Sequence, residues 1–299
     1  MYIMSKELLI IADAGGTKTQ WLCYPSLDKE KEVIITTPGI NASVSSSDSI
    51  AEVITTLSAS IKKLDNDVKI CDLFFYGAGC NSISTKNRLK KLFSEYLPFQ
   101  IRCQEYYSDI EAAARAVYGD EAGLVCILGT GSASGVYDGK IIVDSIPSLG
   151  YIIGDEGSGA QMGKCLLNSF FKRELSNEIN VKLEEFSDMD LSMVIEKVYR
   201  KPEANRYLAS FIPFIKENEH HQEIDKIIDE CLKLFFNKNV LKYKNRPSDR
   251  VRFVGSVACL FSERLANLSM RYELIADVFL QHPLKGLGEY YIQRADGKK

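Results

Sequence analysis

The chain has 299 residues, of which 45% are hydrophobic and 26% are charged, and its formal net charge at pH 7 is −3. This composition is typical of a folded globular protein with one large or two ordinary domains, and it excludes a disordered chain. Lys and Arg nearly balance Asp and Glu, so we expect neither nucleic acid nor an anionic membrane surface as a partner.

Short apolar segments alternate with segments of helical period over the first 119 residues. The apolar segments are followed by turn residues, which is typical of buried strands. The intervening segments carry apolar residues three and four positions apart, as amphipathic helices do. These patterns predict strands at residues 7–16, 20–25, 32–39, 68–79 and 101–109, and helices at residues 46–63, 85–97 and 110–119.

Residues 123–145 repeat the opening pattern of the chain. A buried strand, a glycine-rich turn and a second strand are followed by the hairpin signal DGK and a third strand. Later, a strand with a glycine turn at residues 250–257 leads into another helix. The remaining predicted elements are helices at residues 158–173, 191–200, 204–216, 222–237 and 284–295, and a strand at residues 272–280.

The two similar halves indicate a duplication at the level of pattern. We therefore predict the α/β fold class, with two related domains and a cleft between them. The boundary is expected near residues 113–118, which gives domains at residues 1–115 and 116–284, the second with a helical insertion. The last helix, within residues 285–299, could pack back on the first domain.

The sequence DAGGTKT at Asp13–Thr19 connects a strand to a strand, whereas a Walker loop or a dinucleotide fingerprint connects a strand to a helix. A tight glycine turn can aim backbone N–H groups and threonine hydroxyls at an anion. An acid beside a triphosphate is suited to hold Mg²⁺ through water. An ordinary Asp/Gly hairpin explains the same letters equally well. The predicted phosphate-binding residues are Asp13, which is also the candidate metal ligand, and Gly15, Gly16, Thr17, Lys18 and Thr19.

Two further glycine turns have similar chemistry. LGTGSAS at residues 128–134 presents amides and a hydroxyl at the matching point of the second half-chain. FVGSVAC at residues 253–259 leads a strand into a helix N-terminus, which favours anionic or polar groups such as those of a nucleotide. Taken alone, the third turn is an ordinary strand–helix corner. The predicted nucleotide-binding residues are Gly129, Thr130, Gly131, Ser132, Gly255 and Ser256.

The segments DAGGTKT, YSDIEAAARA, LGTGS, GDEGSG and FVGSV follow one another in the order found in the N-acetylglucosamine kinases. Over residues 10–288 the chain resembles these kinases and the related BadF/BadG/BcrA/BcrD-type ATPases, in the superfamily of actin, heat-shock chaperones and sugar kinases. The resemblance implies two ribonuclease-H-like domains with ATP and Mg²⁺ in the interdomain cleft, and a homodimer. It also implies phosphorylation of an amino sugar, with N-acetylglucosamine and its 6-hydroxyl as the best candidates.

The same resemblance assigns site residues. Asp109 matches the catalytic aspartate that accepts the proton of the sugar hydroxyl, although an Asp at a helix start is also a common cap. The residues that match or adjoin sugar-binding positions are Asn41, Gly79, Gly150, Asp155 and Glu156. Asn41 has the alternative role of a turn residue, and the two acids have that of helix-dipole partners.

One departure from the family pattern concerns the sugar. The kinases carry a G-G-W-G stretch shortly before GDEGSG, whereas this chain has PSLGY at residues 147–151. Leu149 replaces the tryptophan that would pack on the sugar, and Trp21 is the one tryptophan of the chain. A sugar kinase is therefore a safer prediction than any named sugar.

Three other functions fit parts of the sequence. An activator ATPase of the same fold would hold an iron–sulfur cluster through cysteines near the second glycine turn, where this chain has Ser132 and Ser134. A sugar-sensing regulator would need a DNA-binding module, for which there is no length before Leu8. A metal enzyme would rest on His220 and His221, but adjacent histidines point to different faces of a helix.

We expect a cytoplasmic protein. Asp13 interrupts the first apolar run, which is too short for a signal peptide, and no stretch approaches the roughly 20 apolar residues of a membrane helix. The eight cysteines are scattered and none forms a C-x-x-C pair, which favours buried, reduced thiols.

Overall fold

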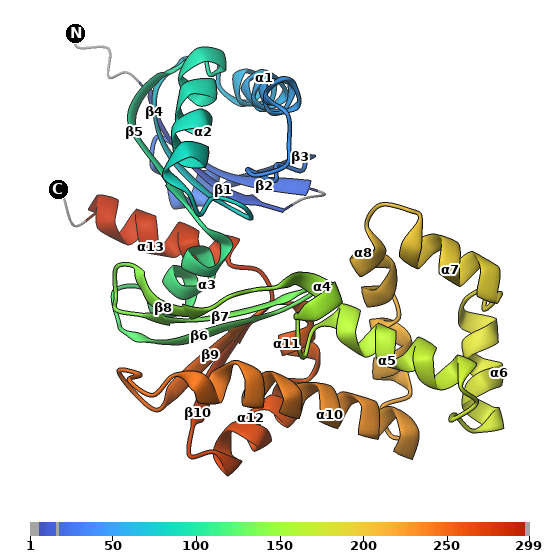
Figure 1. Cartoon of the computed structure of the whole chain (residues 1–299). Helices are drawn as coiled ribbons and strands as arrows, with labels where there is room; N and C mark the ends of the chain where they lie inside the picture. The colour runs from blue at the N-terminus through green and yellow to red at the C-terminus, as the bar shows by residue number, and fades with distance from the viewer. Residues whose placement is uncertain (1–5, 16–17, 297–299) are drawn as a thin grey trace, which may run out of the picture. The chain divides into compact units, whose positions relative to one another are not determined.

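The computed structural model describes residues 6–15 and 18–296 (Figure 1). The chain divides into two compact units. The first comprises residues up to Gly119 together with those from Pro283 onward, and the second comprises Asp120–His282. Each unit contains one mixed five-stranded sheet covered by helices, so the predicted α/β class is confirmed.

The sheet of the first unit has the strand order β3-β2-β1-β4-β5. The first three strands form an antiparallel meander, and β4 and β5 then run parallel to β1. All of the parallel strands, and β3, therefore end at the same edge of the sheet, which we call the carboxyl edge of the first sheet. The strands are β1 (Lys6–Ala14), β2 (Lys18–Pro25), β3 (Val33–Pro38), β4 (Val68–Gly77) and β5 (Gln100–Tyr107).

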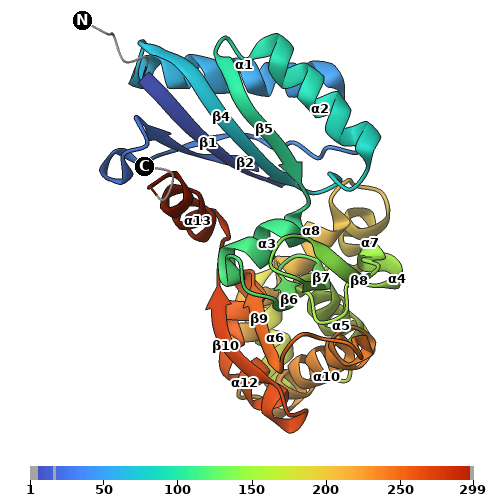
Figure 2. The same ribbon diagram turned by 90° about the vertical axis from the view of Figure 1, so that its left-hand side faces the viewer.

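Both faces of this sheet are buried, because alternate residues of the central strand face opposite sides. Leu8 and Ile10 of β1 join the core under one pair of helices, α1 and α2, whereas Leu9 and Ile11 join the core under another pair, α3 and α13 (Figure 2). The helices are α1 (Ser47–Leu64), α2 (Ile83–Tyr96), α3 (Asp109–Tyr118) and α13 (Leu284–Asp296), with a short 3₁₀ helix at Lys29–Lys31.

The last helix packs on the first unit through a buried arginine. Arg115 of α3 donates hydrogen bonds from Nη1 to the hydroxyls of Tyr76 (2.6 Å) and Tyr291 (3.1 Å). Its guanidinium also lies 4.1 Å from the ring centroid of Tyr107, a cation–π contact. The Tyr291 ring stacks on Phe74 of β4. This cluster joins α13, β4 and β5 to α3, across 176 residues of sequence between Arg115 and Tyr291.

The second sheet repeats the connectivity of the first, with the order β8-β7-β6-β9-β10. The strands β6, β7 and β8 form the antiparallel meander, and β9 and β10 run parallel to β6. The duplication that the sequence pattern indicated is therefore present in the topology. The strands are β6 (Gly123–Leu128), β7 (Ser132–Tyr137), β8 (Ile142–Ile146), β9 (Arg250–Val254) and β10 (Ile275–Leu280).

Most helices of the second unit are formed by the chain segment that follows β8 and precedes β9 in the sequence. They form a large hydrophobic core with one face of the sheet (Figure 1). They are α4 (Gly150–Ile153), α5 (Gly159–Phe171), α6 (Asn177–Phe186), α7 (Leu191–Tyr199), α8 (Ala204–Ala209), α9 (Ile212–Glu217) and α10 (Gln222–Lys238), followed by a 3₁₀ helix at Val240–Lys242. After β9 come α11 (Ser256–Leu260) and α12 (Ser262–Arg271).

Two expectations for this helical region were wrong. The single helix predicted at residues 204–216 is two helices, because Pro213 lacks an N–H and therefore occupies the first turn of a new helix. Helix α6 was not predicted, although Ile179 and Leu183 have helical spacing and are buried.

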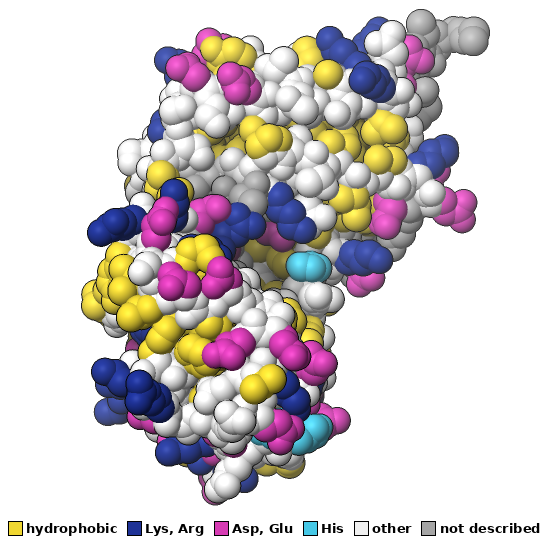
Figure 3. Space-filling view, turned by 90° about the vertical axis from the view of Figure 1, so that its right-hand side faces the viewer, with side chains coloured by type: hydrophobic (Ala, Val, Ile, Leu, Met, Phe, Trp, Pro, Cys, Tyr) yellow, Lys and Arg dark blue, Asp and Glu magenta, His cyan; other side chains and the backbone are white. Residues whose placement is uncertain are grey.

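The helical region also exposes apolar side chains. Leu191, Ile195 and Tyr199 lie four residues apart on α7 and are exposed to solvent. Val181 and Phe186 of the neighbouring α6 are exposed as well. The view toward α6, α7 and α8 shows hydrophobic side chains among charged ones (Figure 3). None of the described helices combines the length and the hydropathy that a membrane span requires.

Replacing Arg115 with Met should lower the free energy of unfolding by roughly 3 kcal/mol, because two hydrogen bonds to a buried charge and the aromatic contacts are lost. Urea unfolding followed by circular dichroism measures the change. The control is Arg271→Met, at an exposed position in the last turn of α12, which should change stability by less than about 0.5 kcal/mol. Equal effects of the two substitutions would contradict the proposed role of Arg115 in holding α13.

Candidate active site

Two carboxylates lie at the carboxyl edge of the first sheet. Asp13 is the penultimate residue of β1 and is paired in register with Tyr76 of β4, which is paired with Tyr107 of β5. Asp109 follows Tyr107 by two residues, so the parallel strands bring both acids to one edge. Loss of hydration and the negative charge of Asp109 raise the pKa of Asp13 to about 6, while the charge of Lys18 opposes the shift.

The turn between β1 and β2 is closed by a hydrogen bond from the Gly15 N–H to the Lys18 carbonyl (3.0 Å). Lys18 is exposed, whereas Thr19 is fully buried. The Thr19 Oγ1 accepts a hydrogen bond from the Ile40 N–H (3.1 Å), so this threonine anchors the loop that carries Asn41. Of the predicted phosphate-binding residues, Gly16 and Thr17 lie outside the described residues.

Asn41 is held in a turn after β3. Its Oδ1 accepts a hydrogen bond from the Ser43 N–H (3.0 Å), and the Ser43 hydroxyl donates to the Gly79 carbonyl (3.0 Å). Gly79 has a φ of +78°, and a Cβ there would lie 2.4 Å from Ser43 Oγ and 2.8 Å from Asn41 Oδ1. Only glycine fits this close approach, so Gly79 determines the position of the Asn41 turn.

Asp109 is the first residue of α3 and is exposed to solvent, but it is not the helix cap. That role belongs to Ser108, whose Oγ accepts a hydrogen bond from the Glu111 N–H (3.4 Å). The Glu111 carboxylate in turn accepts one from the Ser108 N–H (2.8 Å). The alternative role of Asp109 as a cap is therefore corrected. Although the Asp109 carboxylate is open to solvent, the protein atoms packed around it reduce its hydration, and this raises the pKa of the carboxyl.

In the second unit, the predicted glycine turns lie together at the corresponding edge of the sheet. The Gly159 N–H of α5 donates to the Gly129 carbonyl (2.8 Å), and the Ala160 N–H donates to the Thr130 carbonyl (3.1 Å). Gly255 has a φ of +120°, and a Cβ there would lie 2.2 Å from the Leu128 carbonyl oxygen. The second and third turns are therefore in direct contact, which their distance in the sequence did not indicate.

Asp155 lies against the second turn. Its Oδ1 accepts a hydrogen bond from the Ser132 N–H (3.3 Å), and a Cβ at Gly131 would lie 2.9 Å from its Oδ2. Burial raises the pKa of the Asp155 carboxyl, although the hydrogen bonds to Ser132 and Ser148 act in the opposite direction. Asp155 also has a φ of +55°, an uncommon conformation for a non-glycine residue.

Ser148 holds Asp155 in this position and was missed by the sequence reasoning. Its Oγ lies 3.0 Å from the Ser132 carbonyl oxygen, to which it donates, and 3.4 Å from Asp155 Oδ1. The residue belongs to the PSLGY segment that departs from the family pattern. No periodic or compositional signal singles it out, because its partners follow from the tertiary contact of two loops.

The remaining predicted residues of this unit lie close by. Glu156 is half-buried and accepts a hydrogen bond from Asn239 Nδ2 (3.4 Å) at the end of α10. Gly150 begins α4 with a φ of +74°, and no atom lies within 4 Å of a Cβ placed there. Ser256 is exposed at the start of α11. Leu149, which stands where the family has tryptophan, is exposed to solvent.

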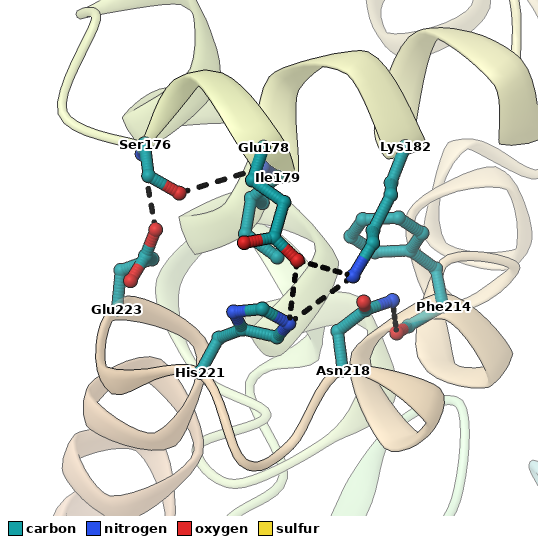
Figure 4. A network of polar contacts seen from close by, with 8 residues as sticks. All are labelled: Ser176, Glu178, Ile179, Lys182, Phe214, Asn218, His221 and Glu223. Carbon is teal, nitrogen blue, oxygen red and sulfur yellow. Dashed lines mark hydrogen bonds and ion pairs between the residues drawn. The ribbon is translucent and has the colours of Figure 1, made fainter.

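Of the adjacent histidines His220 and His221, the second has a structural role. His221 Nε2 lies 3.2 Å from Lys182 Nζ and 3.6 Å from Glu178 Oε1, so it connects α6 to the segment before α10 (Figure 4). Glu223 strengthens the connection by accepting a hydrogen bond from the Ser176 N–H (3.0 Å). Within residues 6–15 and 18–296, no group of three or more His, Cys, Asp or Glu side chains could hold a metal ion.

The raised pKa of Asp13 predicts how the free energy of unfolding depends on pH. The folded state binds its proton more tightly than the unfolded state does, so stability falls as the pH rises from about 4 through 6. Asp13→Asn should therefore raise the free energy of unfolding at pH 7.5 by roughly 1–3 kcal/mol, at about 1.4 kcal/mol per pKa unit. The gain should shrink toward zero near pH 4.

Urea unfolding at pH 7.5 and pH 4.5 measures this difference. Asp144→Asn is the matched control, because Asp144 is exposed on the edge strand β8, and the stability should be unchanged at both pH values. A gain of the same size at both pH values would contradict the electrostatic explanation.

Comparison with known proteins assigns the chain to a family. No protein-family model matches the chain. The N-acetyl-D-glucosamine kinase of Dictyostelium discoideum is 28% identical over 178 residues, and the match spans 56% of this chain and 56% of that protein. The chain thus matches about half the length of this curated relative.

Solved structures match over nearly the whole chain. A candidate N-acetylglucosamine kinase from Porphyromonas gingivalis is 32% identical, with 96% of this chain and 99% of that chain covered and a TM-score of 0.88. Another from Chromobacterium violaceum shares the fold, with 18% identity, 96% and 99% coverage and a TM-score of 0.72. By its sequence and structure the chain belongs to the N-acetylglucosamine kinase family.

Proposed function

We propose that the protein is an ATP-dependent kinase that transfers the γ-phosphate of ATP to an amino sugar, with the 6-hydroxyl of N-acetylglucosamine as the best candidate. The observation that carries the proposal is the pair of acids at the carboxyl edge of the first sheet. Asp109 is exposed, has a raised pKa, and is not needed as the cap of its helix. Its charge interacts with that of Asp13, beside the glycine turn.

Asp109 would act as the general base. Phosphoryl transfer to an alcohol needs a carboxylate that accepts the hydroxyl proton, and most of the remaining catalysis is positioning and charge neutralisation. A carboxylate with a raised pKa binds that proton more strongly than an ordinary aspartate does. The rigid start of α3, fixed by the Ser108–Glu111 capping box, would orient the carboxylate toward the hydroxyl.

The phosphates would be bound by Lys18 and by the first glycine turn, apart from the Gly15 N–H that closes this turn, together with the second turn at Gly129–Ser132. The adenosine would lie beside Gly255 and Ser256. The Asp13 carboxylate is a suitable ligand for Mg²⁺, because the ion prefers carboxylate oxygens and Asp13 interacts with the negative charge of Asp109. When bound, the ion would neutralise phosphate charge. The sequence motif also predicts Gly16, Thr17 and Thr19 as phosphate-binding residues. The Thr19 hydroxyl, however, already accepts a hydrogen bond from the Ile40 N–H and so anchors the loop after β3.

The sugar would be held by Asn41, Asp155 and Glu156. Asn41 offers its amide Nδ2, since its Oδ1 is already occupied by the Ser43 N–H. Gly79 and Gly150 would let the chain pass close to the sugar. Leu149 is exposed in place of the family tryptophan, so the preferred sugar must be measured. The test is ADP release with ATP and Mg²⁺ against N-acetylglucosamine, N-acetylmuramic acid, N-acetylmannosamine, glucosamine and glucose.

We also propose a homodimer, as the family resemblance implies. The exposed apolar stripe of Leu191, Ile195 and Tyr199 on α7 is a surface that a second copy could bury. Light scattering of the purified protein would test this, and a monomeric mass at micromolar concentration would refute it.

The activator-ATPase alternative would require a set of cysteines that bind an iron–sulfur cluster near the second glycine turn. Cys126, on the strand before that turn, is fully buried and so does not favour this alternative.

Asp109→Asn should lower kcat for the preferred sugar by roughly 100- to 10,000-fold, because the base is lost while binding contacts remain. The KM values should change little, and the unfolding free energy at pH 7.5 should rise and not fall, since Ser108 caps the helix and the raised pKa of Asp109 makes its charge unfavourable in the folded state. Steady-state kinetics and urea unfolding measure both. Asp229→Asn, at a partly exposed position of α10 where the carboxylate pairs with Lys233, is the control and should retain wild-type kcat. An Asp109→Asn enzyme with more than a tenth of wild-type kcat would rule out this base.

Gly79→Ala should raise the KM for the sugar at least about tenfold, because its Cβ would collide with Ser43 and displace Asn41. The KM for ATP should be unchanged. The control is Gly119→Ala, which places alanine at a φ of +61° but has no atom closer than 4.0 Å to its Cβ. Alanine at Gly119 is also strained by the positive φ, but it is free of the collision. If both variants raise the sugar KM equally, the Asn41 turn is not the cause.

A further inference from the structure

Two cysteines of the second unit face each other between helices. Cys165 of α5 and Cys231 of α10 have their sulfur atoms 3.8 Å apart, and the Cys231 thiol donates to the Cys165 sulfur. They are 66 residues apart in the sequence, and both are free thiols. Neither residue belongs to the proposed kinase site, and neither was singled out by any sequence pattern.

The two sulfurs differ in accessibility and in proton affinity. Cys165 is partly exposed, whereas Cys231 is buried. The hydrogen bond from Cys231, with help from the charge of the adjacent Lys164, lowers the pKa of Cys165. The same bond and burial raise the pKa of Cys231. The accessible sulfur is therefore the one that carries thiolate character, as the reactive cysteine of a redox pair must.

Other cysteines of the chain have the opposite character. Cys23 and Cys71 are buried in the first sheet, and loss of hydration raises the pKa of each to about 12. Burial also raises the pKa of Cys80 to about 11. These thiols are protonated at neutral pH and closed to solvent, so they are inert. Cys165 thus combines exposure, a lowered pKa and a neighbouring thiol.

The helix packing permits a bond between the two sulfurs. Leu166 and Leu167 of α5 and Ile228 and Leu232 of α10 pack in one core on either side of the pair. An S–S bond of about 2.05 Å requires the sulfurs to approach by only about 1.8 Å. The bond would therefore form between two helices that already share one core, rather than through unfolding.

We propose that Cys165 and Cys231 form a reversible disulfide when the protein meets hydrogen peroxide. The Cys165 thiolate attacks the peroxide oxygen, so an S–O bond forms, the O–O bond breaks, and hydroxide leaves. The Cys231 sulfur then attacks the resulting sulfenic acid. An S–S bond forms, the S–O bond breaks, and the leaving hydroxide takes the Cys231 proton as water. Two thiols are oxidised by two electrons, and a dithiol reverses the reaction.

The disulfide would join two helices that support the GDEGSG loop. Helix α5 begins at Gly159, the last residue of this segment. Helix α10 reaches it through Phe235, whose Cβ would lie 2.7 Å from a Cβ at Gly157, and through Asn239, which donates to Glu156. The bond would thus restrict the relative movement of α5 and α10. This inference is independent of the proposed kinase activity.

The test is to treat the folded, full-length protein with hydrogen peroxide at pH 7.5, alkylate the remaining thiols and map the peptides. A peptide that links Cys165 to Cys231 is expected, with an intact mass lower by two hydrogen atoms, and dithiothreitol should reverse both changes. The measurement uses the wild-type protein and so does not depend on the folding of any variant. Peroxide treatment that leaves both cysteines open to alkylation would overturn the proposal, as would a sulfinic acid at Cys165 without a cross-link.

Variants assign the order of the two sulfurs. Cys231→Ser should stop the reaction at a Cys165 sulfenic acid that dimedone traps, and Cys165→Ser should leave Cys231 unoxidised. Cys103→Ser is the matched control, because Cys103 lies on β5 of the other unit, and it should form the disulfide as the wild type does. A sulfenic acid that forms first on Cys231 would overturn the assignment of the reactive sulfur.

Discussion

The parallel pairing of β1 with β4 and β5 is the constraint on which the proposed active site depends. Parallel strands end at one edge, and the register places Asp13 beside Tyr76 and Tyr76 beside Tyr107. Asp109 must then emerge near Asp13, although 96 positions separate them in the sequence. The sheet holds this arrangement because its central strand is buried on both faces. The acids therefore sit on a rigid element and not on a free loop.

The second unit uses the same connectivity for a different set of contacts. Its glycine turn is fixed by N–H groups of α5, which would otherwise be unsatisfied at the helix start. Gly255 reaches the same turn because β9 lies next to β6 in the sheet. Asp155 completes the cluster through the Ser132 amide. In both units, a duplicated sheet brings glycine turns and an acid to the edge where the strands end.

The electrostatics of the first unit work against stability. Asp13 and Asp109 carry like charges with reduced hydration, and each carboxylate has a raised pKa. A folded protein gains nothing from this pair, whereas a site that binds cations and accepts protons does. The hydrophobic core under α1 and α2 and the buried cluster around Arg115 supply compensating stability elsewhere in the unit. Strained or repulsive groups of this kind are common where function is selected over stability.

The sequence by itself determined the strands, most helices, the glycine turns and their order, because these features depend on local periodicity and turn chemistry. It also indicated the duplication and the family. Only the tertiary structure decided which distant groups meet: Ser148 with Asp155, Arg115 with Tyr291, and Cys165 with Cys231. It also assigned the cap of α3 to Ser108, and it buried Thr19. Such contacts depend on strand register and helix packing between residues far apart in the chain, which no local pattern encodes.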